Sequence, residues 1–279
     1  MVFLGDRLLD QRGHADILTA HVAVVTKLAA AALALPAPSA PLPAQPGPFA
    51  AALVRTEQAL DAAIDRWDTA KPPPRDVTFL ALYEQRLIRR AGSDPRLGRA
   101  VVRRDPAAAD DVTARADLMR LAAGSPPLRA PPRTGRPAPA DRLLAWYREA
   151  QARFGIRWQV LAAVNFVESA FGKVRNVSTA GAEGPMQFEP ATWRAYGLGG
   201  DVHDPHDAIL GAANYLAANH GATRERDALR HYNNSALYVD AVTRYAHHIA
   251  SDRHAFFRYY SWQVYVRTPT GSRRITGPH

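Results

Sequence analysis

Apolar positions recur at helical spacing along most of the chain. Between Phe49 and Trp67 they lie three, four or seven residues apart, which is the spacing of one face of a helix. A second helix is expected around Phe79–Leu87, and weaker periodic stretches follow at 97–104 and 112–121. The stretch Trp158–Phe171 has the same spacing. The pattern therefore predicts an all-α, mainly helical protein.

The C-terminal end has a different pattern. From Tyr260 to Val266 every second residue is apolar or aromatic, which is the period of a strand. The sequence Thr268-Pro269-Thr270-Gly271 that follows is typical of a turn. We expect a short β-hairpin there.

Prolines divide the chain. Pro36–Pro48 contains six prolines, which fix φ and remove backbone donors, so we expect an extended linker. Ser125–Pro139 is a second proline-rich stretch, after which Asp141 opens a helix that Gly155 ends in a left-handed cap. The predicted parts are an N-terminal segment at 1–40, a helical region at 41–124, a linker at 125–140, a second domain at 141–254 and an aromatic, hairpin-forming tail at 255–279.

The N-terminal segment contains a nearly continuous apolar stretch, Ile17–Leu35. Lys27, the apolar residues after it and the small residues Ala37 and Ser39 fit an export signal. The charged residues that precede this stretch also allow an amphipathic or buried first helix. We expect an export signal here and keep the helix as the alternative.

Composition and charge narrow the class of protein. With 279 residues, 47% hydrophobic and 22% charged, the chain is long and apolar enough to bury a core. It has no cysteine, which excludes disulfides, thiolate nucleophiles and Cys-ligated metal sites. The net charge of +9 favours anionic partners. The arginines are scattered and no nucleic-acid-binding motif accompanies them, so we expect no nucleic-acid partner.

Glu168 is the first residue with candidate chemistry. It follows Val160 and Val164 at intervals of four residues, and so lies on the apolar face of the predicted helix. Burial disfavours the charged carboxylate and raises its pKa, as a general acid near neutral pH requires. The alternative is a residue late in the helix that leans into solvent.

The sequence around and after Glu168 resembles a known family, the lytic transglycosylases of the soluble-lytic-transglycosylase type, within the goose-type lysozyme-like superfamily. The resemblance covers about 141–251. Its motifs are Glu168-Ser169-Ala170-Phe171-Gly172, the loop Ser178 to Phe188, Thr192 to Gly197, Asp204 to Ile209, Ala212 to Leu216, Ala228 to Asn233, and Tyr238-Val239.

The resemblance implies a helical, lysozyme-like catalytic domain that cleaves the β-1,4 bond between N-acetylmuramic acid and N-acetylglucosamine in peptidoglycan. Glu168 matches the family's single catalytic carboxylate. In that family it protonates the glycosidic oxygen, then takes the proton of the muramic acid C6 hydroxyl, and a 1,6-anhydro ring closes. No cofactor or metal is expected.

The resemblance also implies a set of substrate-binding residues. Ser178 and Gln187 would hydrogen-bond the substrate or orient Glu168, and Met186 would line the cleft at the cleaved linkage. Phe188 would contact the sugar or pack beneath it. The hydroxyl of Tyr232 would reach toward Glu168, and Asn233 would support the loop.

Ordinary glycosidases need a second carboxylate. Five acidic residues follow Glu168 within reach of the motifs, and for each of them a structural or solvent-exposed role is the better interpretation. They are Glu183, Glu189, Asp201, Asp204 and Asp207.

We therefore predict a peptidoglycan lytic transglycosylase outside the cytoplasm, in the cell wall, secreted or membrane-anchored. Two alternatives use the same cleft: a muramidase that admits water, and a non-catalytic peptidoglycan-binding protein. The sequence leaves the oligomeric state open.

Overall fold

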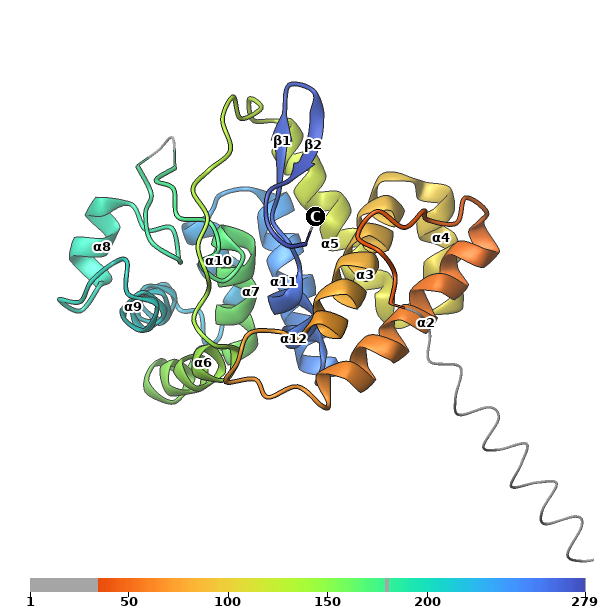
Figure 1. Ribbon diagram of the computed structural model, residues 1–279. Coiled ribbons are helices and arrows are strands. Elements are labelled where there is room, and N and C mark those ends of the chain that lie inside the picture. The colour runs from red at the N-terminus through yellow and green to blue at the C-terminus, as the bar shows by residue number, and fades with distance from the viewer. Residues whose placement is uncertain (1–34, 179–180, 279) are drawn as a thin grey trace, which may run out of the picture. The chain divides into compact units, whose positions relative to one another are not determined.

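The computed structural model describes residues 35–178 and 181–278 and is mainly helical, as predicted (Figure 1). The predicted export stretch lies outside the described residues except for Leu35. The N-terminal helices are α2 (Pro46–Ile64), α3 (Arg75–Ser93), α4 (Pro95–Arg104), the short 3-10 helix η1 (Pro106–Ala108) and α5 (Ala109–Ala123). They are followed by α6 (Ala140–Phe154), α7 (Trp158–Ser169), α8 (Pro190–Tyr196), α9 (Pro205–Ala218), α10 (Glu225–Tyr232), α11 (Ala236–Ser251) and α12 (Ala255–Ser261).

Most predicted helices are confirmed, with shifted ends. α2 begins at Pro46, inside the stretch expected to be extended, because proline fits the first turn of a helix, where its missing N–H is not needed. α6 begins at Ala140 rather than after Asp141, and Gly155 ends it with φ 71°, as predicted.

The C-terminal pattern was right for the hairpin and wrong for the residues before it. β1 (Tyr265–Thr268) pairs with β2 (Gly271–Arg274) in antiparallel register, with Tyr265 opposite Arg274. Tyr260, expected to begin the strand, lies instead in α12. Tyr260 and Trp262 are both buried in the core. The apolar residues at alternate positions therefore reflect burial of the end of α12 and not a strand.

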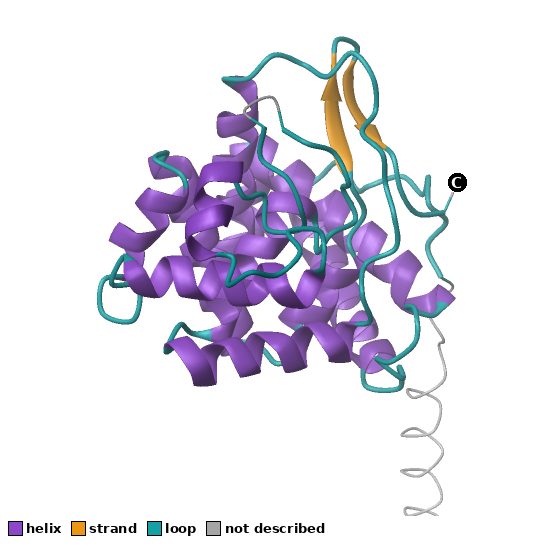
Figure 2. Ribbon diagram, turned by 90° about the vertical axis from the view of Figure 1, so that its left-hand side faces the viewer, coloured by secondary structure: helices purple, strands orange, loops and turns teal. Residues whose placement is uncertain are grey.

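The helices share one core, from Pro36 to the C-terminus. In Figure 1, α2 to α4 lie on one side, α8 and α9 on the other, and α7 and α11 between them. α11 packs against both α5 and α7, so the N-terminal helices are built onto the part of the chain that carries Glu168. The domain boundaries drawn from the prolines stay a prediction. Figure 2 shows the long loops and the hairpin gathered over one side of the helices.

A network of charged side chains joins the same two parts. Arg258 of α12 binds both carboxylate oxygens of Asp61 of α2, at 2.8 and 2.6 Å, and lies 3.0 Å from Asp252. His248 of α11 contacts Asp111 of α5 at 2.9 Å. A paired and hydrogen-bonded charge is tolerated inside a protein, whereas removal of one partner is costly. The network therefore fixes the N-terminal helices against α11 and α12.

None of the helices in the described part of the chain is both long and apolar enough to cross a membrane.

Two buried carboxyl groups in the N-terminal helices, those of Glu57 in α2 and Glu84 in α3, make the free energy of unfolding depend on pH. Burial, with the nearby charge of Glu84, raises the pKa of Glu57 to about 9, and burial raises that of Glu84 to about 7. Both carboxyl groups bind a proton more tightly in the folded chain, so their contribution to stability is lost as the pH rises toward 9.

The variant Glu57→Gln should show a flatter dependence of the free energy of unfolding on pH between about 5 and 9, measured by urea denaturation. The exposed Asp227 provides the control Asp227→Asn, which should keep the wild-type slope. Equal slopes in all three proteins would contradict this assignment.

Candidate active site

Glu168 lies in the last turn of α7, a helix with little exposed surface. Its residues Val160, Leu161 and Val164 are buried in the core. The helix ends because Ala170, Phe171 and Gly172 all have positive φ, at 52°, 62° and 80°. This turns the chain sharply away just after Glu168.

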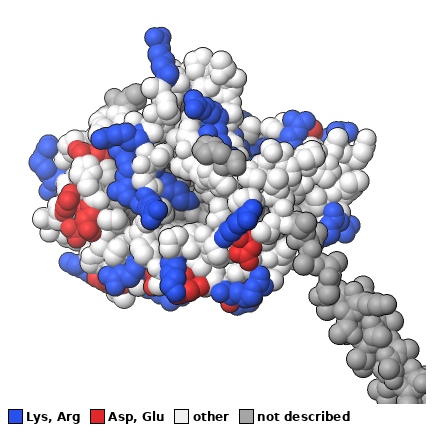
Figure 3. Space-filling model, viewed as in Figure 1, with Lys and Arg blue, Asp and Glu red and all other residues white. Residues whose placement is uncertain are grey.

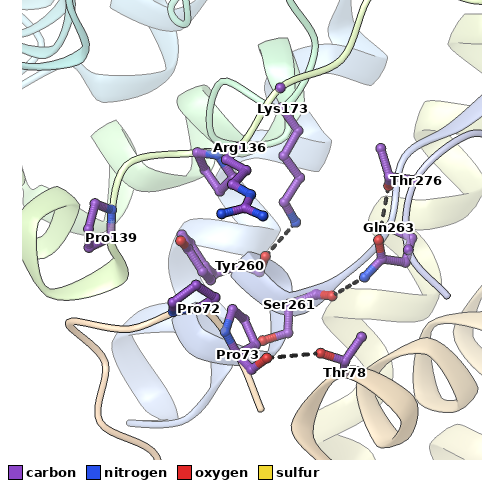
Figure 4. A pocket seen from close by; sticks show the side chains of 13 residues that line it. Pro72, Pro73, Thr78, Arg136, Pro139, Lys173, Tyr260, Ser261, Gln263 and Thr276 are labelled. Carbon is purple, nitrogen blue, oxygen red and sulfur yellow. Dashed lines mark hydrogen bonds between the residues drawn. The ribbon is translucent and has the colours of Figure 1, made fainter. Parts of the chain in front are cut away.

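Two side chains hold the turn after Glu168. The hydroxyl of Ser169 donates to the carbonyl of Pro185 at 2.5 Å and accepts from the N–H of Gly172 at 2.8 Å. The amine of Lys173 donates to the carbonyl of Tyr260 at 2.5 Å (Figure 4) and to the carbonyl of Trp262, also at 2.5 Å. These carbonyls lie at the end of α12, where a helix leaves acceptors free. The buried lysine thus anchors the turn to α12.

Glu168 has one hydrogen-bond partner within the described chain, Tyr238 of α11, whose hydroxyl donates to its Oε1 at 2.6 Å. Burial raises the pKa of Glu168 to about 7, and the hydrogen bond from Tyr238 acts in the opposite direction. A carboxyl group with this pKa is partly protonated at neutral pH, which suits both donation and acceptance of a proton.

The loop after α7 forms a wall beside Glu168. The hydroxyl of Ser178 accepts from the N–H of Ala182 at 2.9 Å, and Glu183 and Phe188 pair through two backbone hydrogen bonds of 3.0 and 2.9 Å. Gly184 has φ 76°, and a Cβ atom there would lie 2.0 Å from the carbonyl oxygen of Val202. Only glycine fits this approach of the loop to the segment before α9.

A cavity of about 370 Å³ lies between this wall, α9 and α10. The predicted catalytic residue and five of the six predicted substrate-binding residues line it. Its lining includes Glu168, Ser178, Gln187, Phe188, Glu189, Thr192, Tyr215, His231, Tyr232 and Asn233. The structure therefore brings Glu168 and five of those six partners to one place.

Met186 is the predicted site residue that does not line the cavity. Its side chain is 0% exposed, and its contribution is a backbone carbonyl that accepts from the hydroxyl of Tyr232 at 2.7 Å. Phe188 is also largely buried, with its ring 5.1 Å from that of Trp193 and 6.0 Å from that of Tyr232. In this structure the Met186 side chain supports the wall from behind, whereas the Phe188 ring is part of the cavity lining.

The tyrosine that reaches Glu168 differs from the one expected. The hydroxyl of Tyr232 is taken by Met186, and the hydrogen bond to Glu168 comes from Tyr238. Tyr238 is the first residue of the buried face of α11, and its spacing in the sequence is that of a core residue. Gln187 donates to the carbonyl of Gly184 at 2.9 Å, and Asn233 accepts from the N–H of Ser235 at 3.1 Å, so both brace loops.

Four of the five other acidic residues have structural partners. Glu183 pairs with His203, and Asp201 accepts from the N–H of that histidine. Asp204 caps α9, and Asp207 accepts from the N–H of Asp201. The fifth, Glu189, is exposed and lines the cavity with Glu168.

The oxygen and nitrogen atoms of Asp204, His206 and Asp207 lie within 4.8 Å of one another, the kind of spacing a metal site requires. Their contacts explain them without an ion. Asp204 accepts from two N–H groups of the first turn of α9, and His206 contacts Glu149 at 3.0 Å. We interpret the cluster as the start of a helix.

Basic side chains are more widespread than acidic ones on the face drawn in Figure 3. This agrees with the net charge of +9 and gives an anionic polymer a favourable surface.

Residues 146–254 match the family model described as the transglycosylase SLT domain. This part of the chain is a transglycosylase SLT domain. It is the lysozyme-like catalytic domain of lytic transglycosylases, and it supports a peptidoglycan-acting function of that general type. The matched residues exclude α2 to α5, α12 and the hairpin. No curated protein and no solved structure matches the chain.

The hydrogen bond from Tyr238 gives a testable prediction for the pKa of Glu168. It stabilises the charged carboxylate, so the variant Tyr238→Phe should raise the pKa of Glu168 further above 7. The pKa can be followed by NMR of a carboxyl-labelled glutamate. The control Tyr215→Phe removes a hydroxyl that donates to the carbonyl of His231 and should leave the pKa unchanged. An unchanged or lower pKa in Tyr238→Phe would contradict the assignment.

The close approach of Gly184 to Val202 gives a testable prediction about stability. Gly184→Ala should destabilise the protein by about 1 to 3 kcal/mol, because a backbone atom of Val202 must move. Gly181→Ala is a matched control, since Gly181 also has positive φ, 82°, but its Cβ would meet nothing within 4 Å. Thermal denaturation of the two variants compares the costs. Equal destabilisation would mean that φ alone, and not the contact, requires glycine at 184.

Proposed function

We propose that the protein is a peptidoglycan lytic transglycosylase that cleaves the β-1,4 bond between N-acetylmuramic acid and N-acetylglucosamine with Glu168 as its acid and base. The observation that carries the proposal is the position of Glu168: a half-buried residue whose carboxyl group has a raised pKa and lines a cavity in a transglycosylase SLT domain.

In the first step the protonated Glu168 gives its proton to the glycosidic oxygen. The bond from that oxygen to C1 of the muramoyl residue breaks, and N-acetylglucosamine leaves with a hydroxyl group. Positive charge develops at C1 and the ring oxygen. The hydroxyl of Tyr238 stabilises the carboxylate that Glu168 becomes.

In the second step the same carboxylate takes the proton of the C6 hydroxyl, and the C6 oxygen bonds to C1. The product is a 1,6-anhydromuramoyl end, and Glu168 is protonated again. The proton cycle closes on one residue without a water molecule, so one carboxyl group is enough.

Hydrolysis is the second candidate, and Glu189 is the observation that favours it. This exposed carboxylate lines the same cavity as Glu168 and has no hydrogen bond or ion pair from its side chain within the described chain. A carboxylate in that place could activate water, as in a muramidase. The product of the reaction distinguishes the two candidates.

We also propose that the protein works outside the cytoplasm, because peptidoglycan lies there. The apolar stretch Ile17–Leu35 supports export.

The variant Glu168→Gln tests the assignment of the acid. The amide has nearly the same shape but cannot supply the proton, so cleavage of purified peptidoglycan should fall by about 10² to 10⁴-fold. Turbidity loss measures cleavage, and co-sedimentation with peptidoglycan measures binding, which should be kept. A variant that binds and still cleaves at the wild-type rate would refute the role of Glu168.

A further inference from the structure

A second cavity, of about 190 Å³, also borders Glu168. Glu168 lines both cavities, so a polymer that passes over it can occupy the two together. The second cavity is lined by Arg89 of α3, Arg115 of α5 and Tyr265 of β1. All three lie outside the residues that match the transglycosylase domain.

The two arginines are placed at a cost to stability. Nε of Arg115 is buried and has no hydrogen-bond partner in the described chain, and none of the described acidic side chains forms an ion pair with Arg115 or Arg89. Arg89 lies with its guanidinium carbon 3.9 Å from the centre of the Tyr265 ring and donates to the hydroxyl of Ser272 at 2.6 Å. Burial lowers the pKa of both, and the charge of Arg115 lowers that of Arg89 further.

This half-buried pair differs from the buried Arg258, which is held by Asp61 and Asp252. A buried cation without a partner costs free energy unless an anion is bound to it. The pKa of Glu168 is set by burial and by Tyr238, so the arginines do not serve to tune it.

We propose that this cavity binds a carboxylate carried by the stem peptide of the peptidoglycan strand. Each muramoyl residue bears a short peptide with free carboxylates, and guanidinium groups that line one cavity match a carboxylate in charge and in their hydrogen-bond donors. The N-terminal helices and the hairpin then supply a peptide subsite to the catalytic domain. This inference rests on the proposed function, because it takes its ligand from that substrate.

The test compares two substrates: native peptidoglycan strands, and strands whose peptide carboxylates have been converted to amides with carbodiimide and ammonia. The wild type should cleave native strands with kcat/KM about tenfold higher, the size expected for a charge-assisted hydrogen bond. Arg115→Met should lose this preference and keep its rate on amidated strands, whereas Arg115→Lys should retain most of the preference. Arg99→Gln, at an exposed position of α4, is the control for net charge.

Stability provides a second readout. Because Arg115 has no hydrogen-bond or ion-pair partner among the described residues, Arg115→Met should have a Tm equal to or above that of the wild type in the absence of substrate. A Tm several degrees lower would give Arg115 a structural role and overturn the proposal. A wild type that cleaves both substrates equally would overturn the subsite and leave the proposed function intact. A wild type that cleaves neither would overturn the proposed function, and the subsite with it.

Discussion

The site depends on the partial burial of one carboxyl group, that of Glu168. Glu168 lies in the last turn of a helix that packs Val160, Leu161 and Val164 in the core, and burial, opposed by the hydrogen bond from Tyr238, raises its pKa to about 7. The contacts around Glu168 hold its carboxyl group in this position. Three residues with positive φ turn the chain away at once, Ser169 and Lys173 fix the turn, and Tyr238 gives the carboxylate a single donor.

The N-terminal helices belong to the same structural unit. α5 packs on α11, and the ion pairs of Arg258 and His248 connect α2 and α5 with the last helices. These contacts hold Arg89 and Arg115 beside Glu168. A change in the N-terminal helices can therefore alter the environment of the Glu168 carboxyl group, although these helices lie far from Glu168 in the sequence.

The sequence predicted the features that follow from local pattern. The helices, the cap at Gly155 and the hairpin come from spacing and turn residues, and the identity of Glu168 came from its place on an apolar stripe together with the motifs after it. What it missed depends on tertiary contacts. Tyr238-Val239 is one of the motifs of the resemblance, but only the packing of α11 against α7 shows that the Tyr238 hydroxyl reaches Glu168. The alternation before the hairpin was read as strand because burial on all sides of α12 hides the helical period.

The same limit applies to the second cavity. Arg89 and Arg115 are ordinary members of an arginine-rich sequence, and only the fold shows that both line a cavity beside Glu168, half-buried and without an acidic partner in the described chain.

The central claim is that Glu168 closes its own proton cycle, and the mass of the cleaved ends tests it most directly. Mass spectrometry of purified peptidoglycan digested by the protein should show 1,6-anhydromuramoyl ends, which are lost with Glu168→Gln and persist with Glu189→Gln. Reducing ends heavier by one water molecule, lost in both variants, would contradict the account and make the protein a hydrolase with two carboxylates.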